Sequence, residues 1–180
     1  MTRWTSVAGL FFLVPGLAYG QVQMNDVPRP GPEVQKLGYY IGSWKGHGVS
    51  KGGPLAPAGK LSSVMTCDWF AGGFQVLCKG EETSASGTRQ FLDILSYDES
   101  ARSYREYSIN NEGDSEYDQG GSLVGNTMTY TIDVAGGKKP VKVRTTEVRV
   151  SPGLRTYRAE IAIGGAPWAM IAQGEIAKVK

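Results

Sequence analysis

Residues 67–78 read CDWFAGGFQVLC, a pattern that is typical of two paired strands joined by a tight turn. Two short, largely apolar runs flank Gly72-Gly73, and a Gly-Gly pair between such runs is a signal for a β-hairpin. Folding the chain at the two glycines places Cys67 directly opposite Cys78, where the Cα separation of cross-strand partners suits a disulfide. The stretch therefore predicts an antiparallel hairpin whose strands are joined by Cys67–Cys78.

The two cysteines have two other interpretations, a zinc site and a redox pair. A zinc site needs more nitrogen or sulfur ligands than these two thiols and the single histidine of the chain, His47, obviously supply. Redox pairs usually have closer spacing and lie at the start of a helix. We favour a structural disulfide over both alternatives, and we expect neither a metal nor a cofactor.

The rest of the chain after Ser43 continues the hairpin pattern. Turn residues separate ten predicted strands, at 44–50, 61–70, 74–81, 88–97, 102–110, 115–121, 126–134, 140–150, 154–163 and 168–178. No later connection is long enough for a crossover helix, so successive strands must be antiparallel neighbours. Closing the sheet removes its two edges. The pattern predicts an all-β, about ten-stranded antiparallel up-and-down barrel, preceded by a short helix from Pro32 that stops at Gly38.

Alternation of apolar and polar residues indicates which side of each strand faces inward. Met128 and Tyr130 share one face of 126–134, and Tyr157 and Ile161 share one face of 154–163. In 140–150 the apolar phase shifts at Thr145-Thr146, which predicts a β-bulge.

The strands at 88–97 and 102–110 carry apolar residues on both faces. If residue 97 pairs with residue 104, one face holds Leu92, Ile94, Ser96, Arg105, Tyr107 and Ile109. The other holds Phe91, Asp93, Leu95, Tyr104 and Glu106. We expect the first set to face inward, because that arrangement puts the two acids outside.

The N-terminus has the pattern of a secretory signal peptide over residues 1–20, with cleavage expected between Gly20 and Gln21. Its apolar run is shorter than the roughly 20 residues that a membrane span needs. We expect a loose arm at 21–32, a barrel domain at 33–180, and a soluble periplasmic or secreted protein without a membrane span.

The formal net charge of the chain is +2, and it becomes +1 when Arg3 is removed with the signal peptide. A charge this close to zero gives no electrostatic reason to expect binding to nucleic acid.

Three segments carry a family resemblance: LGYYIGSWKGHG at 37–48, WFAGGF at 69–74 and LSYDESARSY at 95–104. The chain from about 33 to 178 resembles a bacterial calycin-like, lipocalin-like barrel family, domain of unknown function 1579. The resemblance implies a barrel that Trp44 closes at one end, and it implies no established activity. Lipocalins commonly pack a basic residue from near the last strand on this tryptophan. Here that strand has no arginine; Lys178 is a candidate substitute, and we do not carry that contact over.

The barrel lumen is the candidate site, because ten strands enclose more room than eight. Tyrosines and one arginine in an apolar wall suit a small apolar or amphiphilic ligand with one polar end. The candidate lining residues are Met65, Trp69, Ile94, Arg105, Tyr107, Met128, Tyr130, Tyr157, Ile161 and Met170. The alternatives are a core that these side chains fill, a lyase or isomerase that uses the tyrosines and Arg105, and a structural envelope protein. We assign no catalytic residue and no oligomeric state.

Two further features are interpreted as surface. His47 lies on the opposite face of its strand from Trp44, so we expect it to point outward. The acids Glu112, Asp114, Glu116 and Asp118 do not have the spacing of a calcium loop. We expect them to form a solvated hairpin end.

Overall fold

The computed structural model describes residues 28–134 and 139–179. The predicted signal peptide at 1–20, and the part of the predicted arm that precedes residue 28, lie outside the described residues. Within the described part of the chain, no helix is long and apolar enough to cross a membrane.

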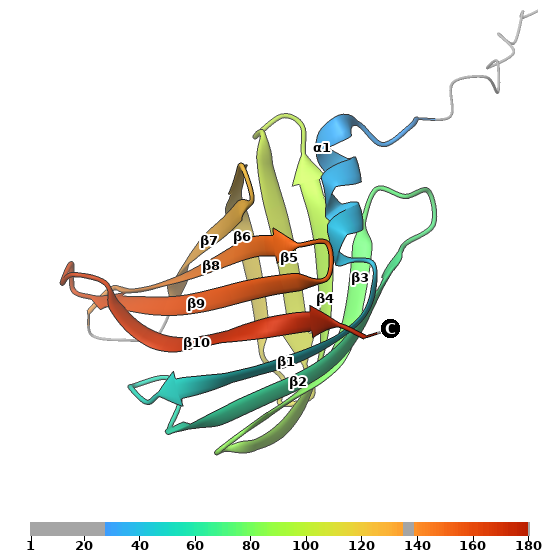
Figure 1. Ribbon diagram of the computed structural model, residues 1–180. Coiled ribbons are helices and arrows are strands. Elements are labelled where there is room, and N and C mark those ends of the chain that lie inside the picture. Colours follow the sequence, from blue (N-terminus) through green and yellow to red (C-terminus); the bar gives the residue numbers. More distant parts are fainter. Residues whose placement is uncertain (1–27, 135–138, 180) are drawn as a thin grey trace, which may run out of the picture.

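A short helix precedes ten strands, as predicted (Figure 1). Helix α1 (Pro32–Gln35) continues into the 3₁₀ helix η1 (Lys36–Tyr40). The strands are β1 (Gly42–Lys51), β2 (Ala58–Trp69), β3 (Val76–Ser84), β4 (Gly87–Asp98), β5 (Ser103–Asn110), β6 (Ser115–Val124), β7 (Thr127–Val134), β8 (Val141–Ser151), β9 (Leu154–Ile163) and β10 (Ala169–Lys178).

The ten strands form a closed antiparallel barrel in which each strand pairs with its neighbours in sequence. Strand β1 completes the closure by pairing with both β2 and β10, so that Trp44 lies between Met65 and Lys178. Closure leaves neither β1 nor β10 as an unpaired edge. The helices lie at one end of the barrel (Figure 1).

The central hairpin has the predicted register, with Cys67 opposite Cys78 and a disulfide of 2.05 Å between their sulfurs. Gly72 and Gly73 have φ values of 88° and 73°, a backbone region that glycine adopts without steric cost. The amide of Phe70 donates a hydrogen bond to the carbonyl of Gln75 across the turn. The disulfide prediction is confirmed.

Two local predictions are wrong. The helical segment does not stop at Gly38 but continues as a 3₁₀ turn to Tyr40. Strand β8 keeps a regular register with β7 and β9 through Thr145-Thr146, and its irregularity lies between Arg149 and Ser151. The apolar residues of β8 change from one face to the other although the strand is regular there. Val148 and Val150 lie on the outer face, where they are 38% and 56% exposed.

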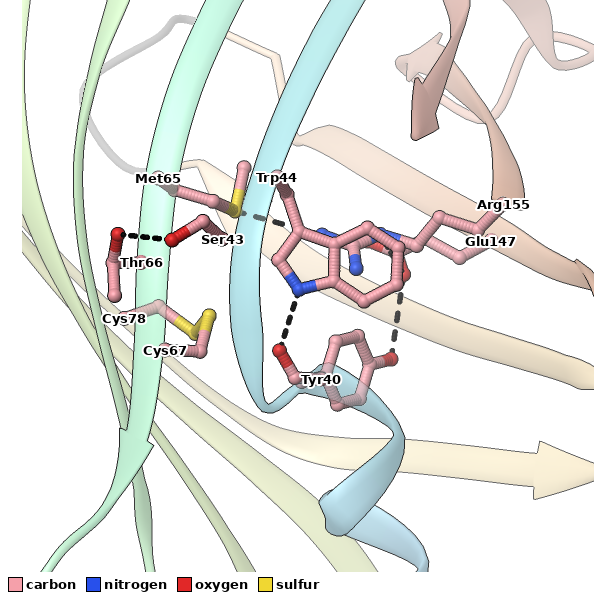
Figure 2. Close-up of a disulfide and its surroundings, with 9 residues drawn as sticks. All are labelled: Tyr40, Ser43, Trp44, Met65, Thr66, Cys67, Cys78, Glu147 and Arg155. Atoms are coloured by element: carbon pink, nitrogen blue, oxygen red, sulfur yellow. Dashed lines mark hydrogen bonds and ion pairs between the residues drawn. A yellow bond between two sulfur atoms is a disulfide. The ribbon is translucent and has the colours of Figure 1, made fainter. Parts of the chain in front are cut away.

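The apolar core fills the end of the barrel nearest the helices. Trp44 is 1% exposed and its Nε1 donates to the carbonyl of Tyr40 at 2.6 Å (Figure 2). The core also contains Leu37, Cys67, Val76, Cys78, Leu95, Tyr104, Met128, Tyr130 and Ile176. Together these side chains close one end of the lumen, which leaves the middle and the opposite end for a site.

Candidate functional site: the barrel lumen

The inner face of strands β4 and β5 is the reverse of the one expected. Residue 97 does pair with residue 104, but Asp93 pairs with Cys78, whose disulfide belongs to the core. Cross-strand partners share a face, so Asp93 faces inward. The same reasoning places Glu106 inward, because it pairs with Leu95, which is 6% exposed.

The acids face inward because the middle of the lumen is a cavity of about 260 Å³ rather than packed core. Carboxylates in such a space keep contact with water, which lowers the cost of placing charge inside the barrel. Six acidic side chains line the cavity: Glu82, Asp93, Glu106, Glu116, Asp118 and Glu147. Its apolar wall consists of Met65, Phe91, Tyr130, Ile132 and Val143.

Two of the six acids have an arginine partner. Glu82 lies 3.3 Å from Arg89, and Glu147 lies 3.3 Å from Arg155. Glu147 also accepts a hydrogen bond from the Tyr40 hydroxyl at 3.3 Å (Figure 2). The other four acids of the cavity form no ion pair with a described residue. The lumen therefore contains more acidic groups than basic ones.

Three of these four carboxyls have raised pKa values. Burial raises the pKa of Asp93 to about 6, although Ser108 donates a hydrogen bond to it at 2.6 Å. Burial, followed by the charges of Asp93 and other lumen acids, raises the pKa of Glu106 well above its usual range. Burial raises the pKa of Asp118 against the hydrogen bond from the Gly120 amide. Each shift means that the surroundings favour the protonated carboxyl over the carboxylate.

Two buried polar atoms at the cavity have no hydrogen-bond partner among the described residues. They are the hydroxyl oxygen of Tyr130 and the Oδ2 atom of Asp118, in side chains that are 9% and 6% exposed. The Tyr130 ring packs over Gly121, where a Cβ atom would overlap it. Glycine at that position therefore allows the tyrosine to line the cavity.

A second pocket of about 460 Å³ adjoins the lumen between β6 and β7. The ladder between these strands pairs Ser122, Leu123 and Val124 with residues 127–129. Beyond that ladder, Glu116 and Ile132 line both the pocket and the lumen cavity. The pocket therefore adjoins the lumen cavity near the ends of β4 to β7 that lie away from the helices.

Six of the ten predicted lumen residues point inward or lie at the closed end. Met65 and Tyr130 line the cavity. Met128 and Ile161 are buried, and Tyr157 lies opposite Glu147 on the inner face. Trp69 ends β2 beside Gly38 and is 39% exposed.

The other four predicted lumen residues face outward. Ile94 and Tyr107 line an outer groove of about 550 Å³ on the surface of β3 to β6. Arg105 forms an ion pair with Asp98 and does not reach the lumen. Met170 pairs with Glu160, on the opposite face of the sheet from Ile161, because the β9–β10 register shifts after Met170. The first three errors share one cause, which is the inverted face of β4 and β5.

Trp44 occupies the position predicted for it, with two cations on its ring. Arg155 of β9 lies 4.6 Å from the ring centroid, and Lys178 of β10 lies 5.2 Å from it. The contact of Lys178 with this ring, which the resemblance left open, is present. Arg155 also lies beside the ring (Figure 2), and that contact was not predicted.

The two features interpreted as surface have different outcomes. His47 points outward, with a side chain 72% exposed, and its Nε2 lies 3.2 Å from Glu175. Glu112, Asp114 and Glu116 are exposed, and Glu116 also borders the cavity, whereas Asp118 is buried. That part of the surface prediction is wrong because β6 turns alternate residues into the lumen. No cluster of three or more metal-ligating side chains occurs in residues 28–134 and 139–179.

Comparison with known proteins supports the fold alone. No family model matches the chain, and no curated protein matches its sequence. The resemblance to the calycin-like family therefore stays a prediction. The crystal structure of Rv2717c from M. tuberculosis is similar to this structure, with a TM-score of 0.60 and 14% sequence identity. The similarity covers 84% of this chain and 99% of that one.

Proposed function

We propose that this chain is an exported binding protein whose barrel, over residues 33–180, holds a small amphiphilic molecule. The observation that carries the proposal is the lumen cavity, with apolar side chains on one wall and carboxyls on the other. Small-molecule sites commonly combine an apolar lining with a few placed polar groups. The Cys67–Cys78 disulfide supports export, because such bonds persist in oxidising compartments.

Native mass spectrometry of the protein purified from its own compartment tests this proposal. We expect a bound small molecule in the wild type and its loss in Val143→Trp, because Val143 lines the cavity. The matched control is Val148→Trp on the outer face of the same strand, which should keep the ligand. Protein without any bound molecule, or equal occupancy in both variants, would contradict lumen binding.

A lyase or isomerase is the second candidate function, and the pKa of Asp93 favours it. A carboxyl with a pKa of about 6 can exchange protons near neutral pH. The acid–base groups would be lumen carboxyls rather than Arg105, which faces outward. Chromatography of the co-purified molecule before and after long incubation separates the two functions. A carried ligand is recovered unchanged, whereas a substrate is converted.

A further inference from the structure

Three carboxyls face the lumen cavity from three neighbouring strands, without forming a cluster that could hold a metal ion. Glu106 of β5 lies directly opposite Asp118 of β6, and both face the cavity. Asp93 of β4 lies opposite Ser108, two residues along β5 from Glu106. Like charges directly across a β-ladder destabilise it. This arrangement needs a compensating positive charge or a bound proton.

The arginines of the lumen do not supply that charge. Arg89 is paired with Glu82, and Arg155 is paired with Glu147 at the closed end. A third inward arginine, Arg149, lies over the rings of Tyr39 and Tyr40 at the closed end. None of the three forms an ion pair with the lumen carboxyls on β4, β5 and β6. Compensation therefore comes from a bound proton or from a cation outside the described residues.

Tyr130 gives an independent indication of where that cation binds. Its side chain is 91% buried, since 9% of it is exposed, and it lines the cavity that the acids line. Its hydroxyl oxygen has no hydrogen-bond partner among the described residues, and neither has Asp118 Oδ2. Both atoms accept hydrogen bonds, and leaving them unpaired in a buried place costs free energy. A donor with several N–H groups would satisfy both.

We infer that the lumen ligand is an organic amine whose ammonium group binds among Asp93, Glu106, Asp118 and the Tyr130 hydroxyl. The inference rests on the proposed function and names the ligand class. Ammonium–carboxylate hydrogen bonds are charge-assisted and therefore strong. The rings of Phe91 and Tyr130 also line the cavity and offer faces to a cation.

The apolar wall indicates the rest of the ligand. Met65, Ile132 and Val143 line the same cavity and suit a short hydrocarbon body. The volume of about 260 Å³ lies below the range of roughly 300–1,000 Å³ that is usual for drug-sized ligands. An anion would meet the repulsion of the lumen carboxylates. The described residues contain no cluster of ligands that would hold a metal ion.

Isothermal titration calorimetry with three six-carbon probes tests the inference at pH 7.5. The probes are hexylammonium, hexanol and hexanoate, which share a hydrocarbon chain and differ in charge. We expect hexylammonium to bind at least tenfold more tightly than hexanol, and hexanoate to bind most weakly. Preference for hexanol or hexanoate overturns the amine inference and leaves lumen binding standing. If no probe binds and native mass spectrometry finds no ligand, both proposals fail.

Two variants test the placement of the ammonium group. Asp118→Asn and Tyr130→Phe should each weaken hexylammonium binding about fivefold to tenfold and change hexanol binding less than twofold. Tyr130→Phe removes a hydroxyl without a partner, so it should melt at or above the wild-type temperature. The control is Asp68→Asn, an exposed carboxyl next to Cys67 on β2. Equal weakening in this control would show a general charge effect and overturn the placement.

Discussion

The closed end and the middle of the lumen differ in how their ionisable side chains are paired. At the closed end, Arg155 contacts Glu147 and lies over the ring of Trp44. In the middle of the lumen, Glu106 and Asp118 face each other without a cation among the described residues. The first arrangement compensates charge and stabilises the fold. In the second, no cation in the part of the chain that the structure describes lies beside the two carboxyls, so burial raises their pKa values and their charged forms cost stability.

This difference distinguishes the residues that stabilise the fold from those that form the candidate site. At the closed end Glu147 has an arginine partner, although nitrogen atoms of Arg149 and Arg155 also lack a hydrogen-bond partner among the described residues and lie over aromatic rings instead. Groups that remain unpaired next to a cavity are typical of functional sites, because perturbed pKa values and unsatisfied atoms gather there. The comparison predicts that substitutions at the closed end lower stability, whereas neutralising substitutions in the lumen raise it.

Trp44→Ala should have the largest effect on stability. Trp44 is 1% exposed and donates a hydrogen bond to Tyr40, so truncation leaves a cavity and an unpaired carbonyl. We expect a loss of about 3–5 kcal/mol in the free energy of unfolding, measured by urea denaturation of ligand-free protein. Trp69→Ala is the control, because Trp69 is 39% exposed and should lose less. Equal losses would mean that Trp44 does not close the barrel.

The strand pattern could be predicted from sequence because turn residues mark every boundary. Gly72-Gly73 determines the register of the hairpin and therefore the disulfide. Regular alternation also placed Met128 and Tyr130 correctly on the inner face. Short connections and the absence of a crossover leave closure as the way to remove both edges, and the structure has that closure.

The acidic lumen could not be predicted because apolar residues occupy both faces of β4. Leu92 and Ile94 alternate with Phe91 and Asp93, so periodicity alone does not choose the inner face. The expectation that acids face water fails where the interior itself is a cavity. One feature of the sequence does favour the observed inner face. Asp93 shares its face with Leu95, and Glu106 shares its face with Tyr104; Leu95 and Tyr104 are both buried.

Asp93→Asn should stabilise the ligand-free protein at neutral pH. The pKa of Asp93 rises from 3.8 to about 6 on folding, so the folded state binds the proton more tightly. Its contribution to stability is therefore greatest below pH 4 and is lost as the pH rises from about 4 to 6. One pKa unit corresponds to about 1.4 kcal/mol, and solvent screening reduces the effect. We therefore expect the variant to gain about 1–2 kcal/mol in the free energy of unfolding at pH 7.5.

Thermal melts between pH 4 and 8 check this prediction. The variant should melt higher than the wild type at pH 7.5, and the difference should shrink toward pH 4. Asparagine keeps an oxygen that accepts the hydrogen bond from Ser108, so that contact does not confuse the result. Arg89, Glu106, Glu116 and Glu147 also contribute to the potential at Asp93. A variant less stable at pH 7.5 would show that the lumen charge is already compensated.

His47→Ala should have the smallest effect on the free energy of unfolding. It is a direct contrast with Trp44→Ala, because His47 and Trp44 lie on opposite faces of the same strand, β1. Its side chain is 72% exposed, and its only ion-pair partner among the described residues is Glu175, itself 46% exposed. Exposed pairs of this kind contribute little, so the loss should stay within about 0.5 kcal/mol, or roughly 1–2 °C in melting temperature. Glu175→Gln should give the same small change if the pair is the only interaction involved. Ligand occupancy in native mass spectra should not change, because His47 lies on the face of β1 away from the lumen. A large loss of stability or of bound ligand in His47→Ala would mean that the outer face of β1 contributes to stability or binding. A stabilising closed end and a ligand-binding lumen would then not account for the whole molecule.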